Sequence, residues 1–135
     1  MSVRGVSLLC GLLAVAIGAS GCVAVAVGAG AAGTVAYLAG DLEVHQSHDV
    51  DTVFAASKQA LADLQMTVIE GRTTKDALGA RIVARDATDK EIVVNLKATV
   101  VGATDISIRV GTFGDDTKSH LIYEKIRENL KEASI

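Results

Sequence analysis

Two histidines beside two aspartates are the residues of this sequence with the clearest potential for metal chemistry. His45 and His48 form a His-x-x-His pair, and Asp49 and Asp51 follow directly. Such a pair can place two ligands on one helix face, but a zinc site needs three or four ligands and supporting partners. No cysteine or third histidine lies nearby. Helix capping and solvation explain these residues better, so we expect no metal ligand and no cofactor.

A glycine-flanked turn is the second candidate, with the sequence Gly111-Thr112-Phe113-Gly114-Asp115-Asp116. Such a backbone before a helix N-terminus can bind an anion. Asp115 and Asp116, however, lie where a phosphate would be and would repel it. We expect a tight strand-to-helix turn in which Phe113 packs into the core and Asp115 caps the helix. The alternative is an interaction corner at Phe113 and Asp115, with Phe113 exposed as an anchor for a partner.

No set of residues in the sequence is arranged for nucleophilic catalysis. Ser119 and His120 are adjacent, so on a helix their side chains point about 100° apart. The acidic pairs lie at expected helix starts, where solvation is the ordinary explanation. We therefore expect that the protein is not an enzyme. None of four serines in the expected domain has the sequence context of a nucleophile elbow: Ser47, Ser57, Ser107 and Ser119.

One cysteine stands where a lipid could be attached. A start carrying Arg4, an apolar run from Val6 to Ile17 and small residues before Cys22 are the signature of a secretory signal. Ala19-Ser20-Gly21-Cys22 resembles the bacterial lipobox, with Ala19 where that pattern more often has leucine. The resemblance implies transfer of diacylglycerol to the Cys22 thiol and cleavage between Gly21 and Cys22. An uncleaved apolar anchor is the alternative, since about 20 apolar residues can cross a bilayer.

Cleavage would leave an apolar, glycine-rich segment at the start of the mature chain. Cys10 would be removed with the signal, so Cys22 would be the one remaining cysteine. Residues 22–40 contain Gly28, Gly30 and Gly33. Ala26 with Gly30 and Ala29 with Gly33 have small-xxx-small spacing, which lets helices approach closely in lipid. We therefore expect either a pliable linker or a membrane-associated helix that self-associates. In Gram-negative lipoproteins, an aspartate directly after the lipidated cysteine resembles an inner-membrane retention signal. Val23 stands at that position here, which for a Gram-negative source favours an outer-membrane, periplasm-facing position.

Composition excludes two classes of partner. The 135 residues carry a formal net charge of −3, whereas a nucleic-acid binder or a polybasic membrane-surface protein would have a basic surface. Half of the chain is hydrophobic and only 3% is aromatic, so aliphatic residues must form the core. We expect three parts: residues 1–21 as signal peptide, 22–40 as lipidated segment, and 41–135 as a soluble α+β domain.

Hydrophobic periodicity within this domain predicts the order β-α-β-β-β-β-α. Strands are expected at 37–46, 66–70, 80–85 and 91–101 and around 106–110, with a turn at 88–90. One helix follows an Asp49 cap and ends near Gln65, and another follows Asp115. We expect a two-layer α+β sandwich, in which a sheet of four to five antiparallel strands has both helices on one face. The predicted inner helix stripes are Val50, Val53, Phe54, Ala60, Leu61 and Leu64, and Ser119, Ile122, Tyr123, Ile126 and Leu130.

Four parts of the chain carry a further resemblance. The lipobox, the Gly/Ala segment, the stretch Tyr37 to Glu43 and the stretch Ile106 to Asp115, with its VGTFGD motif, resemble small bacterial lipoproteins of unknown function. The resemblance covers nearly the whole mature chain and implies a lipoprotein with this α+β order, but no catalytic residue. We expect a membrane-anchored, non-enzymatic structural or protein-interaction module of the periplasm, with an unknown protein partner. The alternative is a lipoprotein that binds an apolar ligand, such as a lipid, between helices and sheet.

Overall fold

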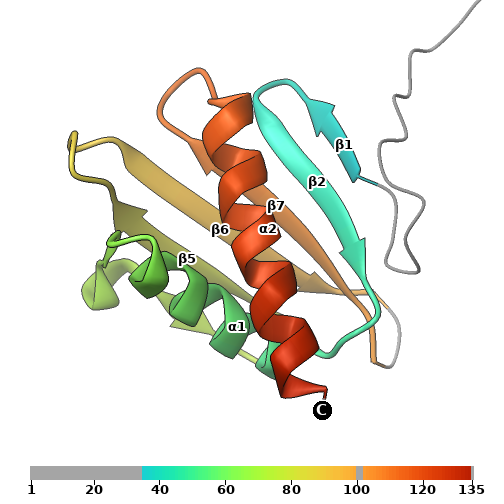
Figure 1. The fold of residues 1–135 in the computed structure, drawn as a ribbon. Helices are drawn as coiled ribbons and strands as arrows, with labels where there is room; N and C mark the ends of the chain where they lie inside the picture. The colour runs from blue at the N-terminus through green and yellow to red at the C-terminus, as the bar shows by residue number, and fades with distance from the viewer. Residues whose placement is uncertain (1–34, 100–101, 135) are drawn as a thin grey trace, which may run out of the picture.

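The computed structural model describes residues 35–99 and 102–134 (Figure 1). One antiparallel sheet of seven strands carries two helices on one face, which confirms the predicted two-layer α+β class. The expected signal peptide, Cys22 and the glycines at 28, 30 and 33 lie outside the described residues. None of the helices in the described ranges is both long and apolar enough to cross a membrane.

The sheet has the strand order β1-β2-β7-β6-β5-β3, and β4 pairs with β5 beside it. Helix α1 contacts β5 and β6, and helix α2 contacts β2 and β7. The strands are β1 Val35–Leu38, β2 Asp41–Gln46, β3 Thr67–Val68, β4 Thr74–Lys75, β5 Gly79–Arg85, β6 Glu91–Ala98 and β7 Thr104–Val110; the helices are α1 Val50–Asp63, the short 3-10 helix η1 Glu70–Arg72 and α2 Asp116–Ala133.

The first strand region differs from the prediction, because the single strand expected over 37–46 is a hairpin. Strands β1 and β2 pair antiparallel around the two residues Ala39 and Gly40, whose φ angles are 51° and 92°. Two successive residues with positive φ form the type of turn that matches the twist of a hairpin. Alanine is not a usual residue there, so no turn signal is present in the sequence. The hairpin extends the sheet to Val35, ahead of the expected domain start at residue 41.

The segment between α1 and β5 also differs from the prediction. The strand expected over 66–70 is reduced to β3, and the expected polar connection contains η1 and β4. The β1–β2 hairpin and the additional β4 raise the number of strands to seven, above the predicted four to five. Val83, which alternation places on the same face of β5 as Arg81 and Arg85, is fully buried. The segment that leads into η1 lies beside it, since Val83 O accepts from Ile69 N at 2.7 Å.

The core between the layers agrees with the predicted stripes. All five residues of the α2 stripe are buried, while in α1 Phe54 and Leu64 are only partly buried. Asp49 caps α1 by accepting from Thr52 N at 2.7 Å, and Asp115 caps α2 by accepting from Lys118 N at 3.0 Å. The side chains with no exposed surface include Leu42, Ile82, Ile92, Val94, Ile106 and Ile108 of the sheet and Val53, Leu61, Ile122 and Ile126 of the helices.

Candidate functional site

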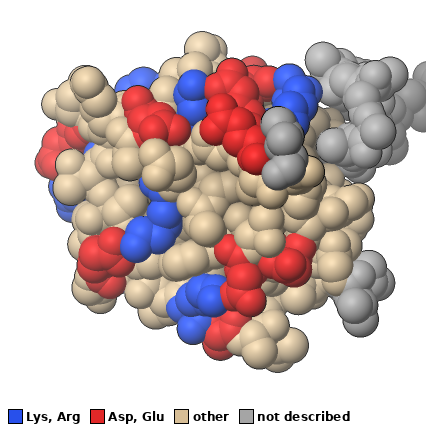
Figure 2. All heavy atoms as spheres, turned by 60° about the horizontal axis from the view of Figure 1, so that its bottom comes forward, with Lys and Arg blue, Asp and Glu red and all other residues tan. Residues whose placement is uncertain are grey.

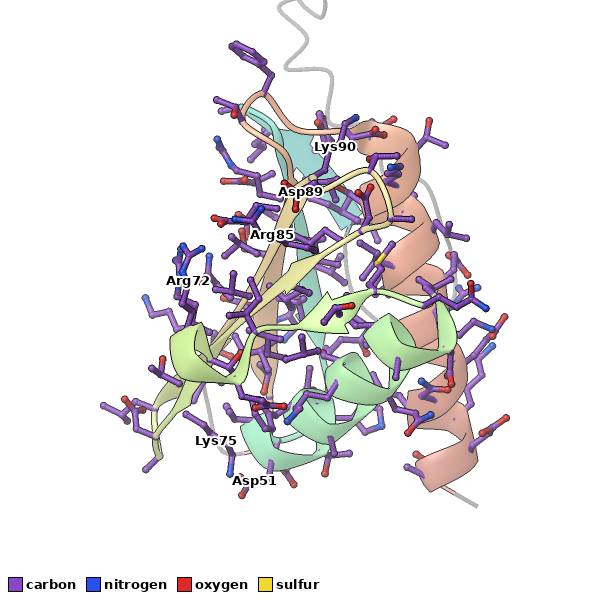
Figure 3. All side chains as sticks on the ribbon, turned by 90° about the vertical axis from the view of Figure 1, so that its left-hand side faces the viewer. Asp51, Arg72, Lys75, Arg85, Asp89 and Lys90 are labelled. Carbon is purple, nitrogen blue, oxygen red and sulfur yellow. The ribbon has the colours of Figure 1, made fainter. Side chains whose placement is uncertain are left out.

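The face of the sheet opposite the helices is polar, and we call it the open face. Successive strand residues point to opposite sides, so each residue between two core residues lies on this face. Figure 2 views the molecule from a different side, the lower end in Figure 1, and there too acidic and basic side chains are interspersed. Figure 3 shows Arg72 and Arg85 directed away from the two helices. The residues of this face that the site involves are Asp41, His45, Arg81, Arg85, Glu91, Val93, Asn95, Asp105 and Arg109.

Ion pairs organise the open face. Arg72 of η1 donates to Glu91 of β6 at 2.5 Å and 3.4 Å, and it holds the pKa of the Glu91 carboxyl below its ordinary value. Arg85 donates to Asp89 at 2.7 Å, and Arg81 donates to Asn95 at 3.2 Å. Partly exposed pairs of this kind contribute little to stability. Their effect is to hold long cationic side chains in defined positions.

A hollow of about 720 Å³ lies on the open face between these pairs. Its lining includes Arg81, Lys90 and Arg109 as cations, Val93 as an apolar residue, and Phe113 from the turn after β7. Arginine and aromatic residues are enriched where proteins bind one another. The hollow therefore has the composition of a binding surface.

Two turns meet beside this hollow, and we call their meeting point the glycine corner (residues 38–41 and 111–115). A Cβ atom on Gly114 would overlap Gly40 O and would lie 2.5 Å from the Tyr37 hydroxyl oxygen. A Cβ atom on Gly40 would lie 2.7 Å from Phe113 O. Only glycine at both positions lets the two backbones approach this closely.

Arg109 joins the two turns of the glycine corner. Its Nε donates to Asp41 Oδ1 at 2.5 Å, its Nη2 to Ala39 O at 3.0 Å and its Nη1 to Thr112 O at 3.3 Å. One guanidinium group thus bonds to both sides of the corner, and its planar fork suits such multiple contacts. The stretches Tyr37 to Glu43 and Ile106 to Asp115, far apart in the sequence, are held together here.

Phe113 lies at the tip of the glycine corner and is 92% exposed. The prediction that it packs into the core is therefore wrong, while the predicted cap by Asp115 is confirmed. Gly111 and Gly114 have φ angles of 72° and 84°, and the turn between them carries Phe113 out of the sheet. Leu38, on the neighbouring turn, is 62% exposed. An exposed Phe113 is the geometry that the interaction-corner hypothesis requires, and the partner stays a prediction.

The residues of the His-x-x-His pair are separated in the structure. His45 Nδ1 lies 2.7 Å from Asp105 Oδ1 on β7, whereas His48 Nε2 lies 3.4 Å from Ser134 Oγ at the end of α2. Within residues 35–99 and 102–134, no three His, Cys, Asp or Glu side chains are grouped as metal ligands. Asp105 was not expected as the partner of His45, because only the register of β2 with β7 brings the two together.

Comparison with known proteins identifies a family but no activity. The model of a family described as "Protein of unknown function (DUF3568)" matches residues 5–129. This range contains both stretches that meet at the glycine corner. Among curated proteins, none matches the chain.

Proposed function

Because the chain belongs to this family of proteins of unknown function, we propose from its own residues that it is a membrane-anchored bacterial lipoprotein without enzymatic activity. Its folded domain is a structural or protein-interaction module that faces the periplasm from the outer membrane. Support for the anchor comes from the apolar segment, the small residues and Cys22 in lipobox order. Two or more acyl chains suffice for stable attachment without a membrane-spanning segment.

Intact-mass analysis of membrane-extracted protein tests the anchor. The mass should correspond to a chain that begins at Cys22 and carries acyl groups. Cys22→Ser should abolish the lipid mass and the membrane attachment. Cys10→Ser is the matched control and should change neither, because Cys10 leaves with the signal peptide. A Cys22→Ser protein that keeps the wild-type processing and attachment would exclude this anchor.

The observation that carries the interaction role is the hollow on the open face. Arg81 and Arg109 are held by hydrogen bonds before any partner arrives, which lowers the entropy lost on binding. The acidic and basic groups around the hollow favour a protein partner with complementary charges, because such complementarity gives specificity. The described residues of this surface hold no set of side chains that we can assign to catalysis.

Site-specific photocrosslinking in cells tests the interaction role. A photoreactive residue at Arg81, on the open face, should give a reproducible adduct with one protein. The same residue at Glu124, exposed on α2, is the matched control and should not give that adduct. Equal labelling from both positions, or no adduct from Arg81, would count against a binding surface on the open face.

Binding of an apolar ligand between the layers is the second candidate function. The observation behind it is two buried hydroxyls: Ser57 Oγ and Ser119 Oγ have no hydrogen-bond partner among the described residues, and the polar end of a lipid would supply one. Native mass spectrometry of the gently purified protein should then show a bound small molecule. A ligand-free mass would dispose of this candidate.

We also propose that the chain self-associates through residues 22–40. Close packing of helices in lipid needs small residues, so Gly30→Leu should abolish a higher oligomer in detergent. Ala31→Leu, one position along a helix, is the control and should preserve it. An oligomer that survives Gly30→Leu would exclude this mode of association.

A further inference from the structure

The glycine corner presents an apolar tip on a rigid support. Phe113 is 92% exposed and Leu38 is 62% exposed, and the backbone contact between Gly40 and Gly114 holds their turns together. We propose that this tip docks on the surface of the bilayer to which the chain is tethered, with the Phe113 ring among the lipid headgroups. The inference rests on the lipid anchor of the proposed function.

The charges around the tip are paired, which indicates the kind of membrane surface it suits. Arg109 is paired with Asp41, and Lys90 lies 3.5 Å from Asp115. Attraction to anionic lipids depends on clusters of unpaired lysine and arginine. A phenylalanine side chain can bury its apolar ring at the headgroup–acyl boundary of a neutral bilayer without such a cluster. The docking surface is therefore a zwitterionic bilayer, and high salt should not weaken the contact.

The length of chain before the domain keeps the tip within reach of the bilayer. Val35, the first residue of β1, is 13 residues after Cys22. A fully extended chain spans about 3.5 Å per residue, so β1 begins no more than about 45 Å from a lipid on Cys22. Leu38 follows three residues later, at the other end of β1. The tip is thus close in sequence to the point where the tether enters the domain.

The small size of the tip favours lipid over a protein or a second copy of the chain. Stable protein interfaces bury more than about 1,000 Å² in total, which the Phe113 and Leu38 side chains do not supply without the adjoining hollow. A tethered domain needs far less contact, because the tether turns docking into an intramolecular step at high effective concentration. Fixing both turns in advance lowers the entropy lost on docking further.

A single tryptophan provides the test, since the chain contains none. The full lipidated chain with Phe113→Trp is reconstituted into phosphatidylcholine vesicles without other protein. We expect blue-shifted emission, quenching by brominated lipid and protection from iodide, all of which persist in high salt. Leu78→Trp is the matched control: Leu78 is 77% exposed, and its carbonyl accepts from Ala98 N, at the opposite end of β6 from the corner. Its emission should stay that of a residue in water.

The outcomes separate this inference from the anchor on which it depends. If the intact mass shows the lipid but the Phe113→Trp probe is as open to iodide as the Leu78→Trp probe, docking is wrong and the anchor stands. Shielding found in native membranes and not in protein-free vesicles would overturn lipid docking in favour of a protein partner. Loss of the shift in high salt would overturn the neutral contact. If the intact mass shows no lipid, the anchor and the docking both fail.

Discussion

The carbonyl oxygen of Gly40 occupies the place where a Cβ atom on Gly114 would be. The two residues belong to separate turns, one between β1 and β2 and the other between β7 and α2. Their contact fixes the position of Phe113 relative to Leu38. The close contact requires glycine at both positions, and so does the backbone conformation, since φ is +92° at Gly40 and +84° at Gly114.

Replacement of Gly114 should destabilise the domain strongly. In Gly114→Ala the new methyl group would meet both Gly40 O and the Tyr37 hydroxyl, and an alanine would be strained at positive φ. We expect a loss of more than about 1 kcal/mol in the free energy of unfolding, measured by denaturant titration. Gly71→Ala is the control, since nothing lies within 4 Å of its Cβ position. Equal effects of the two substitutions would contradict the close contact at the corner.

Replacing Ala39 in the β1–β2 turn by asparagine should stabilise the domain. Ala39 has a φ of 51° and is exposed, and Asn-Gly is the preferred pair for a two-residue hairpin turn. Ala39→Asn should therefore raise the free energy of unfolding by up to about 1 kcal/mol. Ala39→Val should lower it, because a β-branched residue tolerates positive φ poorly. Thermal unfolding of both variants checks the prediction, and a lower stability of Ala39→Asn would argue against this turn.

Asp86 should make the stability depend on pH in the acid range. Its side chain is 7% exposed; it pairs with Lys118 and accepts from Thr88 Oγ1 at 2.7 Å and Lys90 N at 3.0 Å. The Lys118 ammonium, followed by the Thr88 hydroxyl, holds the pKa of the Asp86 carboxyl well below its ordinary value. This contribution is present above the unfolded pKa of about 3.9 and is lost as the pH falls towards the lower pKa of the folded state.

Asp86→Asn should accordingly lower the unfolding midpoint at pH 7 and make the loss of stability on acidification shallower. Asp51→Asn is the control, because the Asp51 side chain is 78% exposed and pairs only at the surface with Lys75. Midpoints measured from about pH 7 down to about pH 2 compare the variants across the range in which the carboxyl titrates. If the stability of Asp86→Asn falls on acidification as steeply as that of the wild type, Asp86 is not the cause of the acid dependence.

A buried hydrogen bond between Gln46 and Tyr123 should matter for stability. Gln46 Nε2 donates to the Tyr123 hydroxyl at 2.7 Å, and the two residues are 1% and 3% exposed. Tyr123→Phe leaves a buried donor unpaired, which costs about 1–3 kcal/mol. Tyr37→Phe is the control and should change the free energy of unfolding by less than about 0.5 kcal/mol. In a double-mutant cycle, Gln46→Leu with Tyr123→Phe should cost less than the sum of the single changes.

Local patterns in the sequence predicted most of the secondary structure. Both helix caps, the inner stripe of α2 and the alternation in β6 and β7 appear where expected, because each depends on residues a few positions apart. The Ala39–Gly40 turn was missed, since alanine carries no turn signal. The short strand β4 was missed, and the strand expected over 66–70 is longer than the observed β3, for a different reason: pairing with β5 defines both strands, rather than any pattern of their own.

The sequence by itself determined the class of the fold and the helix caps, and it is the whole basis of the prediction that a lipid is attached to Cys22. Only the tertiary structure decided which distant residues meet: Gly40 with Gly114, His45 with Asp105, and Gln46 with Tyr123. It also placed Phe113 on the outside, against the expectation of a core residue. Periodicity and propensity act over a few residues, whereas these contacts depend on strand register and on how the helices pack across the sheet, so no local pattern records them.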